Sequence, residues 1–446
     1  SWNNRVVSDP LLTGTGSGNS SLGGFFTGAL TNGTNTLQTA TYQVTPVFRA
    51  GGVDCAGTPF TATIFVNAKA VINLITTTIC SGAPFTVSPA NITNGIVPAG
   101  TRYKWLTPTQ TSSLTGGESS TLLQNNISGL LFNNSSVIQT ATYTVTPNTL
   151  LCGDNNPFTL VLTVYPRPAI DAMTTVTCSG IQFVVSPVDI INGRVPDNNS
   201  YSWDPPSVTP GLSGGQSNSG QPFISGTLNN SLSVVQTATY IITPTSQYNC
   251  VGGTFTLTVT VNPGGFINAM TTATCSGVMF NVTPVNGTNG IVPDGTKYTW
   301  NAPSYTGTVS GGAPSSGPQD GIFGLLTNGT NVVQTVTYLV TATPPTGTCA
   351  NNTFTVTVTL YPAPQINEMS TVVCSGTGFS VAATNTLNGI VPVNTQYIWN
   401  TPNRSTASLT NGTGNATYVN AITGLLNNAT NIQQTATYTV TPRAVL

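Results

Sequence analysis

The sequence contains no histidine and very few charged residues, and both absences narrow its function. Without histidine the chain lacks the commonest general base and the Ser-His and Cys-His pairs of many hydrolases. Only 5% of its residues are charged and the formal net charge is -1, so it offers no basic surface for nucleic acid. No apolar run approaches the roughly 20 residues that cross a bilayer. These absences disfavour an enzyme, a nucleic-acid partner and membrane insertion.

The chain nevertheless has the composition of a folded protein. Hydrophobic residues make up 38% of it, whereas disordered chains combine low hydrophobicity with high net charge. Threonine, serine and asparagine must therefore keep the surface hydrated. The sequence predicts a folded protein with a neutral, polar surface.

An internal repeat of about 98 residues organises the whole chain. A Cys-Ser-Gly triplet recurs at periods of 98, 97 and 99 residues, and each of its cysteines precedes a tryptophan by 25 residues. A second cysteine set has periods of 97, 98 and 99, and a Gln-Thr-Ala/Val-Thr-Tyr block ends at a regularly spaced tyrosine. The members of these ladders are Cys80, Cys178, Cys275 and Cys374; Cys55, Cys152, Cys250 and Cys349; Trp2, Trp105, Trp203, Trp300 and Trp399; and Tyr42, Tyr143, Tyr240, Tyr338 and Tyr438.

Every unit has the pattern of β-strands. Segments such as FTLVLTV (158–164) and FTLTVTV (255–261) alternate large apolar residues with threonine, as half-buried strands do. Asn-Gly turns recur before a Val-Pro pair and a Tyr-x-Trp segment. Short strands, frequent turns and about 100 residues per unit predict an all-β fold of tandem immunoglobulin-like β-sandwich domains arranged as a rod.

The aromatic ladders predict the core of each sandwich. The tryptophans fit the buried tryptophan of the central strand, and the tyrosines fit a strand start where a sandwich often places a corner-forming tyrosine. Both ladders are interpreted as core packing. An aromatic sugar-binding platform would instead need exposed rings.

Proline-containing junctions divide the chain into five units. We expect a partial repeat at residues 1–68, complete repeats at 69–166, 167–263 and 264–362, and a partial repeat at 363–446. Because the junctions are only a few residues long, neighbouring domains should lie end to end with limited bending. The first and last residues both fall inside a domain, and the N-terminal residues lack the pattern of a signal peptide. We expect a window on a longer tandem array.

The combined pattern TxxCSGxxFxVxP, NGxVPxxxxYxW, QTATYxVTP and FTxTVTVxP resembles the PKD-like (polycystic-kidney-disease-like) repeats of very large Bacteroidetes surface proteins. The resemblance covers essentially the whole chain. Such proteins are typically exported by the type IX secretion system, and several are gliding or surface adhesins. The resemblance therefore implies a stalk-like role on a cell surface, with adhesive modules elsewhere.

Repeated cysteines in a charge-poor β protein predict disulfides and an extracellular, oxidising location. The preferred pairing is within repeats, as Cys80–Cys152, Cys178–Cys250 and Cys275–Cys349, with Cys55 and Cys374 bonded to partners outside the fragment. One difficulty opposes it, because the two cysteines of a repeat are expected at opposite ends of a simple sandwich while a disulfide needs Cα atoms within about 7 Å. Pairing across junctions, as Cys80–Cys250 and Cys178–Cys349, is an alternative, and so are free thiols. Pairing across a 25-residue gap, such as Cys152–Cys178, would require a sharp reversal of the chain.

Other motifs carry no site. The glycine-rich segments GTGSGNS (14–20) and SGGQSNSG (213–220) lack the Gly-Lys-Ser/Thr ending of a phosphate loop. Asp197 and Asp294 follow the Val-Pro turn in two repeats only, and no Asp-x-Asp series accompanies them. We expect no catalytic residue, no cofactor and no metal.

These observations predict the non-enzymatic stalk or filament region of a large, secreted bacterial surface adhesin. Its expected partners are further copies of the same repeat in a longer chain, together with self-association through uncharged strand edges. Surface glycans or other cells would be bound by modules not present here. The alternatives are a glycan- or ligand-binding repeat array and the spacer region of a secreted multidomain enzyme.

Overall fold

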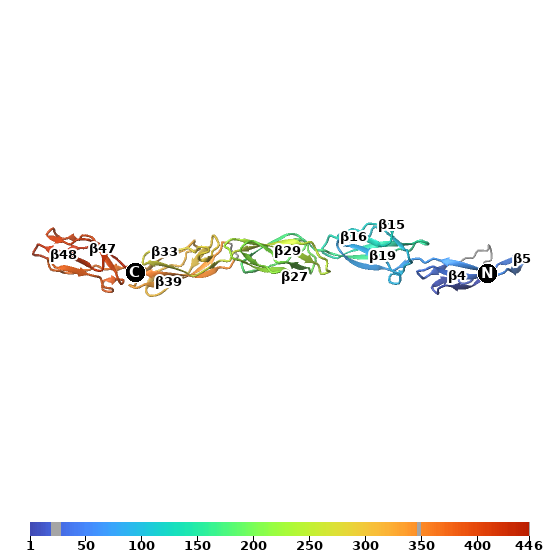
Figure 1. The fold of residues 1–446 in the computed structure, drawn as a ribbon, viewed down its shortest axis with the longest axis horizontal. Coiled ribbons are helices and arrows are strands. Elements are labelled where there is room, and N and C mark those ends of the chain that lie inside the picture. Colours follow the sequence, from blue (N-terminus) through green and yellow to red (C-terminus); the bar gives the residue numbers. More distant parts are fainter. Residues whose placement is uncertain (19–27, 346–348, 446) are drawn as a thin grey trace.

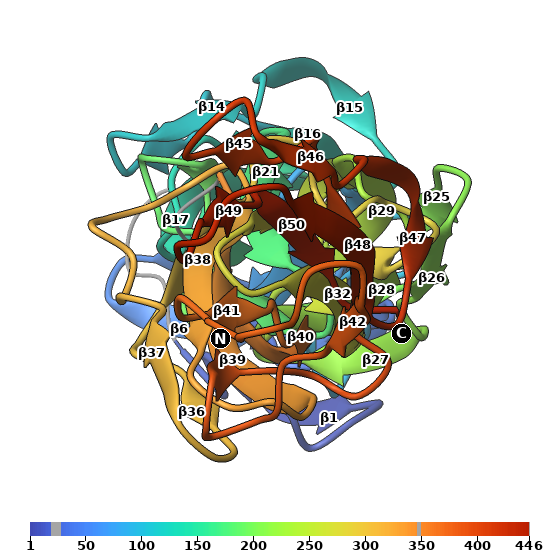
Figure 2. The ribbon, with the colours of Figure 1, turned by 90° about the vertical axis from the view of Figure 1, so that its left-hand side faces the viewer.

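The structure is a computed structural model that describes residues 1–18, 28–345 and 349–445. These residues form β-strands, turns and extended segments, with no helix among them. Figure 1 shows the repeats following one another as a straight rod, with the chain progressing steadily from one end towards the other. Viewed along the rod, the repeats stack over one another around a common axis (Figure 2). The chain is thus an all-β tandem array of immunoglobulin-like sandwiches.

The repeat at 69–166 shows how one sandwich is built. Its strands are β8 (Val71–Ile72), β9 (Ile75–Cys80), β10 (Pro84–Val87), β11 (Gly95–Ile96), β12 (Arg102–Trp105), β13 (Thr109–Gln110), β14 (Leu114–Gly116), β15 (Ser120–Gln124), β16 (Ile127–Asn133), β17 (Gln139–Thr149), β18 (Gly153–Asp154) and β19 (Phe158–Tyr165). The larger sheet has the order β15-β12-β17-β19-β9, with β13 and β18 paired to β17. The facing sheet has the order β10-β16-β14. Strand β9 lies parallel to β19, whereas the other pairs of these two sheets are antiparallel.

The next two repeats follow the same plan. Repeat 167–263 comprises β20 (Ala169–Ile170), β21 (Met173–Cys178), β22 (Gln182–Val185), β23 (Gly193–Arg194), β24 (Ser200–Trp203), β25 (Ser207–Val208), β26 (Leu212–Gly214), β27 (Asn218–Gln221), β28 (Ile224–Asn230), β29 (Gln236–Thr245) and β30 (Phe255–Asn262). Repeat 264–362 comprises β31 (Phe266–Ile267), β32 (Met270–Cys275), β33 (Met279–Val282), β34 (Gly290–Ile291), β35 (Lys297–Trp300), β36 (Ser304–Tyr305), β37 (Val309–Gly311), β38 (Ile322–Asn328), β39 (Gln334–Thr343) and β40 (Asn352–Tyr361).

The two outer units contain parts of this plan. Residues 1–68 contribute β1 (Trp2–Val7), β2 (Leu12–Gly14), β3 (Leu30–Asn32), β4 (Gln38–Val44), β5 (Val47–Ala50), β6 (Val53–Ala56) and β7 (Phe60–Val66). Residues 363–446 contribute β41 (Gln365–Ile366), β42 (Gly378–Val381), β43 (Gly389–Ile390), β44 (Gln396–Trp399), β45 (Asn403–Arg404), β46 (Leu409–Asn411), β47 (Asn415–Val419), β48 (Ile422–Asn428), β49 (Ala436–Thr437) and β50 (Val440–Arg443).

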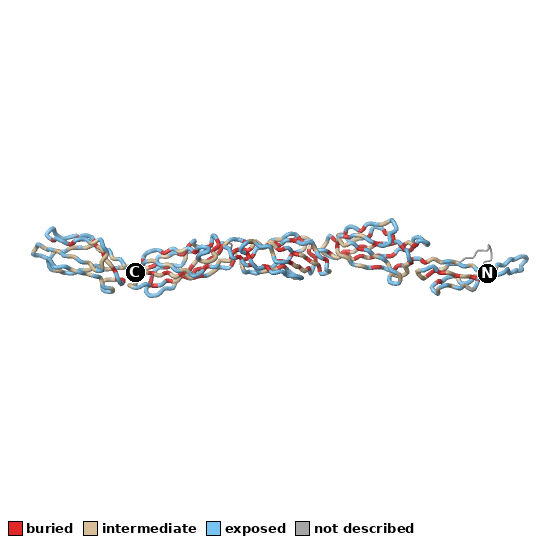
Figure 3. Tube along the Cα trace, viewed as in Figure 1, coloured by how far each residue is buried: buried red, intermediate tan, exposed pale blue. Residues whose placement is uncertain are grey.

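Each complete repeat has its own hydrophobic core. The alternation of apolar residues with threonine places one face of β19 inside and the other outside, because successive side chains of a strand point to opposite faces. Buried residues accordingly alternate with more exposed ones along the strands of the complete repeats (Figure 3). The five ladder tryptophans are buried, and so are Tyr42, Tyr143, Tyr240 and Tyr338, whereas Tyr438 is only half-buried.

The expected tyrosine corner is wrong. Tyr143 lies in the middle of the long strand β17, and its hydroxyl is buried with no hydrogen-bond partner among the described residues. Its ring instead packs edge-on against Phe85, with centroids 5.7 Å apart. The tyrosine therefore fills the core between the two sheets, which an edge-to-face pair stabilises beyond simple burial.

Candidate functional site: the junctions between repeats

The Cys-Ser-Gly triplet forms a turn at the end of the parallel strand. Cys80 is the last residue of β9 and lies opposite Tyr165, the last residue of β19. The Ser81 amide continues the ladder by donating to the Tyr165 carbonyl at 2.9 Å. Gly82 has a φ of 73°, a left-handed conformation that glycine adopts without steric cost, and its amide donates to the Leu131 carbonyl at 2.8 Å. The triplet therefore places its cysteine at the end of the repeat that adjoins the next one.

A buried asparagine holds this turn against the rest of the sandwich. The Ser81 hydroxyl accepts a hydrogen bond from the Asn133 amide at 2.9 Å. The Asn133 side chain donates from Nδ2 to the carbonyls of Val137 and Val164, at 2.7 and 3.0 Å. One side chain thus joins the end of β16, the following turn and the last strand. The equivalent residues are Asn32, Asn230, Asn328 and Asn428.

Two disulfides cross the junctions between neighbouring repeats. Cys80, at the end of β9, bonds to Cys250, in the hairpin connection between β29 and β30 of the next repeat. Cys178, at the end of β21, bonds to Cys349, just before β40. The Cα atoms of the two pairs are 5.6 and 5.5 Å apart, within the usual range for a disulfide. The same connection is therefore made twice, one repeat apart.

The preferred pairing within repeats is wrong for the reason that opposed it. Cys80 lies beside Tyr165, whereas Cys152 lies in the connection that precedes Phe158, so the length of β19 separates them. Eight residues of strand, at about 3.3 Å each, place the two cysteines more than about 20 Å apart, far beyond the roughly 7 Å that a disulfide spans. The same argument excludes Cys178–Cys250 and Cys275–Cys349. Junction pairing, the alternative, is what the structure contains.

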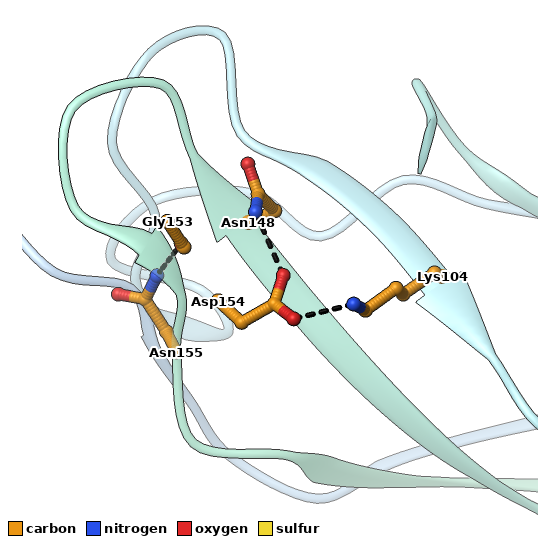
Figure 4. Close-up of polar contacts among 5 residues, drawn as sticks. All are labelled: Lys104, Asn148, Gly153, Asp154 and Asn155. Atoms are coloured by element: carbon orange, nitrogen blue, oxygen red, sulfur yellow. Dashed lines mark hydrogen bonds and ion pairs between the residues drawn. The ribbon is translucent and has the colours of Figure 1, made fainter. Parts of the chain in front are cut away.

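Cys55, Cys152, Cys275 and Cys374 are not bonded within the described residues. Cys152 lies in the turn between β17 and β18. Polar contacts around Asp154 hold the end of this hairpin (Figure 4). Asp154 pairs with Lys104 of β12 and accepts a hydrogen bond from Asn148 at 2.7 Å. The hydrogen bonds from Lys104 and Asn148 hold the pKa of Asp154 below its ordinary value. The hairpin end is therefore held by polar contacts, although Cys152 forms no disulfide within the described residues.

Noncovalent contacts accompany the disulfides at both junctions. Tyr165 stacks on Tyr248, which is two residues from Cys250, with ring centroids 4.2 Å apart. The Ser136 hydroxyl donates to the Asp189 carboxylate at 2.6 Å across the junction that Cys80–Cys250 bridges. Across the junction that Cys178–Cys349 bridges, Asn286 Nδ2 donates to the Ser233 hydroxyl at 3.0 Å. Each junction therefore combines a covalent bond with directional contacts on other parts of the interface.

Asp189 also shapes the loop on its own side of the junction. Its carboxylate accepts the hydrogen bond from Ser136 and another from the Val195 amide at 2.8 Å, and these bonds keep its pKa below the ordinary value. In the other repeats an asparagine takes the same position and accepts the equivalent amide bond. These residues are Asn91, Asn286 and Asn385.

The remaining motifs do not gather into a site. Asp197 and Asp294 are exposed, and the second glycine-rich segment, 213–220, lies at β26 and β27. The first, at 14–20, extends into residues outside the described ones. In the described residues no three His, Cys, Asp or Glu side chains are close enough to hold a metal ion. Nor is there, over the same ranges, a helix that is long and apolar enough to cross a membrane.

Sequence reasoning missed the asparagines that organise the turn and the junction. Asn133 and its equivalents recur with the period of the repeat, which was a usable signal. Several of them also begin Asn-x-Ser/Thr triplets, a pattern that is read first as a glycosylation acceptor. Burial of Asn133, which is 0% exposed, gives it a structural role instead.

The fold and the junctions define a tandem array of immunoglobulin-like sandwiches linked covalently from one repeat to the next. A family model described as the PKD-like domain matches residues 1–70, 77–168, 175–265 and 272–364. The chain therefore belongs to the PKD-like domain family. A search of curated proteins gives no match.

Solved structures also match this chain at low sequence identity. The human desmocollin-1 ectodomain is 11% identical, with a TM-score of 0.23, and the match covers 92% of this chain and 84% of that one. Sidekick-1 immunoglobulin domains 1–4 are 10% identical, with a TM-score of 0.18 and coverage of 82% and 95%. The Bacteroides ovatus protein SGBP-B, solved with a mixed-linkage heptasaccharide, is 12% identical, with a TM-score of 0.15 and coverage of 78% and 87%. At these scores the likenesses carry no argument about function.

Proposed function

We propose that this chain is the structural stalk region of a large bacterial cell-surface adhesin, a non-enzymatic spacer that carries attachment or gliding modules away from the cell. The observation that carries the proposal is the pair of junction disulfides, Cys80–Cys250 and Cys178–Cys349, each of which joins one repeat to the next. A bond inside a repeat would stabilise a domain, whereas a bond across a junction controls how two domains are oriented. Fixing the orientation of successive domains keeps the stalk extended and so lengthens its reach.

An extracellular location agrees with these bonds, since disulfides persist in oxidising compartments and are rare in the cytosol. The PKD-like family and its resemblance to repeats of type IX-secreted Bacteroidetes surface proteins support the adhesin context. Further copies of the repeat in a longer chain are the natural partners of Cys55 and Cys374. In a longer array, the junction rule would also bond Cys152 and Cys275 to neighbouring repeats.

Electron microscopy of the oxidised chain tests the stalk role. We expect straight rods, and we expect the Cys80→Ser/Cys178→Ser variant to bend at the two junctions that lose their bridges while each repeat stays folded. A chain with residues 167–362 duplicated should lengthen in proportion and gain no binding activity. Equal straightness of the variant and the parent chain would remove the role assigned to the bridges.

A glycan array separates the stalk from a ligand-binding repeat array. The stalk proposal expects no saturable binding by the oxidised chain. Specific binding of one glycan, lost on substitution of exposed aromatic residues such as Tyr305, would replace the stalk with the ligand-binding function.

A further inference from the structure

The junction disulfides change which covalent bonds carry tension along the rod. From Cys80 a disulfide leads to Cys250 in the next repeat. From Cys250 the backbone runs forward through β30, crosses the junction at 263–265, and continues through β31 and β32 to Cys275. A covalent route therefore passes from Cys80 to Cys275 without including residues 81–249.

This route is already extended in the folded protein. Between Cys250 and Cys275, strands β30, β31 and β32 supply 8, 2 and 6 residues. Strand residues rise about 3.3 Å each, close to the 3.3–3.6 Å limit of a stretched chain. Strand β30 extends along one repeat, and β32 then extends along the next in parallel with its last strand, β40. The route has little slack to give up under load.

A second route runs beside the first. Cys178 leads through its disulfide to Cys349, and the backbone then continues through β40 and β41 to Cys374. In the repeat at 264–362 the two routes are neighbouring strands, since β32 belongs to the first and β40 to the second. Their parallel ladder extends from Met270↔Val356 to Cys275↔Tyr361. Hydrogen bonds can therefore share load between the two routes along the whole of this ladder.

We propose that these two routes are tension-bearing lines that make the array nearly inextensible. The strands between the two cysteines of a repeat, such as β22 to β29, contain most of the sandwich core and connect one line to the other. With both lines intact, unfolding those strands adds no length between the ends of a line. This mechanical role deepens the proposed stalk function and depends on that function for its biological purpose.

Force spectroscopy on the full oxidised chain tests the first line. Handles are attached through azide-bearing amino acids at Thr78 and Ala273, two exposed positions. The Cys80–Cys250 bond removes 170 of the 195 residues that separate the handles, leaving 25. At about 3.5 Å per residue, the maximum extension is about 90 Å with the bond intact and about 680 Å with both disulfides reduced. We expect a roughly eightfold increase in maximum extension on adding dithiothreitol. In the Cys80→Ser/Cys250→Ser variant without reductant, the Cys178–Cys349 bond still shortens the path to 176 residues, 100 from Thr78 to Cys178 and 76 from Cys349 to Ala273, so the increase should be about sevenfold, to about 620 Å.

The second line supplies a matched measurement. Handles at the equivalent exposed positions Val176 and Val372 span the Cys178–Cys349 bond, which removes 171 residues from the path. The Cys80→Ser/Cys250→Ser variant should leave this second extension limit unchanged. Far-ultraviolet circular dichroism of each variant checks that the repeats remain folded.

Two results would overturn the proposal. An oxidised chain that extends to the length of 176 residues or more between Thr78 and Ala273 lacks the first line. A limit corresponding to about 51 residues would mean that the bonds lie within repeats, because that path passes through Cys152 and Cys178. Neither result bears on glycan binding, so failure of the tension lines and failure of the stalk function are distinguishable.

Discussion

The repeat at 167–263 and the unit at 363–446 share their sequence pattern but differ in how completely they close. In the first, Met173–Cys178 forms strand β21 against β30. In the second, the equivalent residues 369–374 form no strand, and no described strand corresponds to β30. Tyr240 is 0% exposed, whereas Tyr438 is half-buried beside an open groove that Phe379 and Leu426 also line. The comparison teaches that the last strand both covers the core and provides the ladder on which the parallel strand forms.

The largest expected difference between these two units is in the stability lost when a core leucine is truncated to alanine. Leu228 is 0% exposed, and Leu228→Ala should lower the free energy of unfolding of its repeat by about 2–5 kcal/mol, through lost burial and the cavity left behind. The equivalent Leu426 is only partly buried, so Leu426→Ala should cost about half as much. Hydrogen-exchange mass spectrometry resolves the repeats separately. Equal costs would mean that the open groove does not weaken packing at Leu426.

The turn asparagines provide a second matched pair. Asn230 Nδ2 donates to the carbonyls of Val234 and Val261, and the second of these bonds reaches β30. Among the described residues, Asn428 Nδ2 donates only the equivalent of the first bond, to the Ile432 carbonyl. Asn230→Ala should therefore destabilise its repeat by about 1–3 kcal/mol, because a buried carbonyl loses its partner, and Asn428→Ala should cost less. Local exchange rates around β28 and β48 measure both effects. A larger cost at Asn428 would contradict the role assigned to the bond with the last strand.

A peptide strand added in trans should make the open unit at 363–446 more like the closed repeat at 167–263. A peptide with the sequence of residues 255–263 presents Phe255, Leu257, Val259 and Val261 on one face, the face that is buried in its own repeat. Added to the chain, it should slow amide exchange at residues 369–374 on the order of tenfold, which corresponds to about 1.4 kcal/mol.

The matched control is the same peptide with those four apolar residues replaced by serine, which keeps the backbone donors and acceptors but removes the buried face. Protection by both peptides alike would show that backbone pairing suffices and that the groove does not select apolar side chains. Protection by neither would contradict the idea that the groove accepts this strand.

The smallest expected difference between the two units is in their response to alkaline pH. Burial raises the pKa of Tyr240 from 10.0 to about 12 and also raises that of Tyr438. Because the neutral form is favoured in the folded state, this contribution to stability is fully present below pH 10 and is lost as the pH rises through about 12. Arg404 lowers the pKa of Tyr438 and so opposes the effect of burial there.

Tyr438 should therefore deprotonate before Tyr240 as the pH rises. Tyrosinate absorbance, compared between Tyr240→Phe and Tyr438→Phe variants, assigns the two midpoints. The reverse order would mean that the groove beside Tyr438 is closed in solution.

Much of the fold could be predicted because its signals are local and repeated. Alternation of apolar residues with threonine determines which face of β19 is buried, and period-matched tryptophans and tyrosines mark the core. Roles that depend on exact position were harder to predict. Tyr143 has the sequence position of a corner-forming tyrosine, yet its hydroxyl points into the core, because β17 begins earlier and extends further than the pattern indicated.

The candidate site likewise has one part that the sequence predicts and one part that it leaves open. The period of the repeat identifies the cysteines, and junction pairing is one of the alternatives that the sequence leaves open. The choice between Cys152 and Cys250 as the partner of Cys80 could not come from sequence separation alone, because a disulfide depends on a distance of a few ångströms between Cα atoms. The parallel ladder from Ile75↔Leu160 to Cys80↔Tyr165 decides it, since that ladder places Cys80 at the far end of its repeat.

The sequence by itself determined that this chain is an all-β protein of tandem repeats, with a tryptophan and tyrosine core and regularly repeated cysteines. It could do so because strand alternation, turn residues and repeat period are properties of the chain read in order. Only the tertiary structure decided that Cys80 and Cys178 bond to cysteines of the next repeat, so that covalent routes cross those two junctions. Those properties depend on which residues meet in space, and the parallel pairing of β9, β21 and β32 with the last strands of the three complete repeats brings them together.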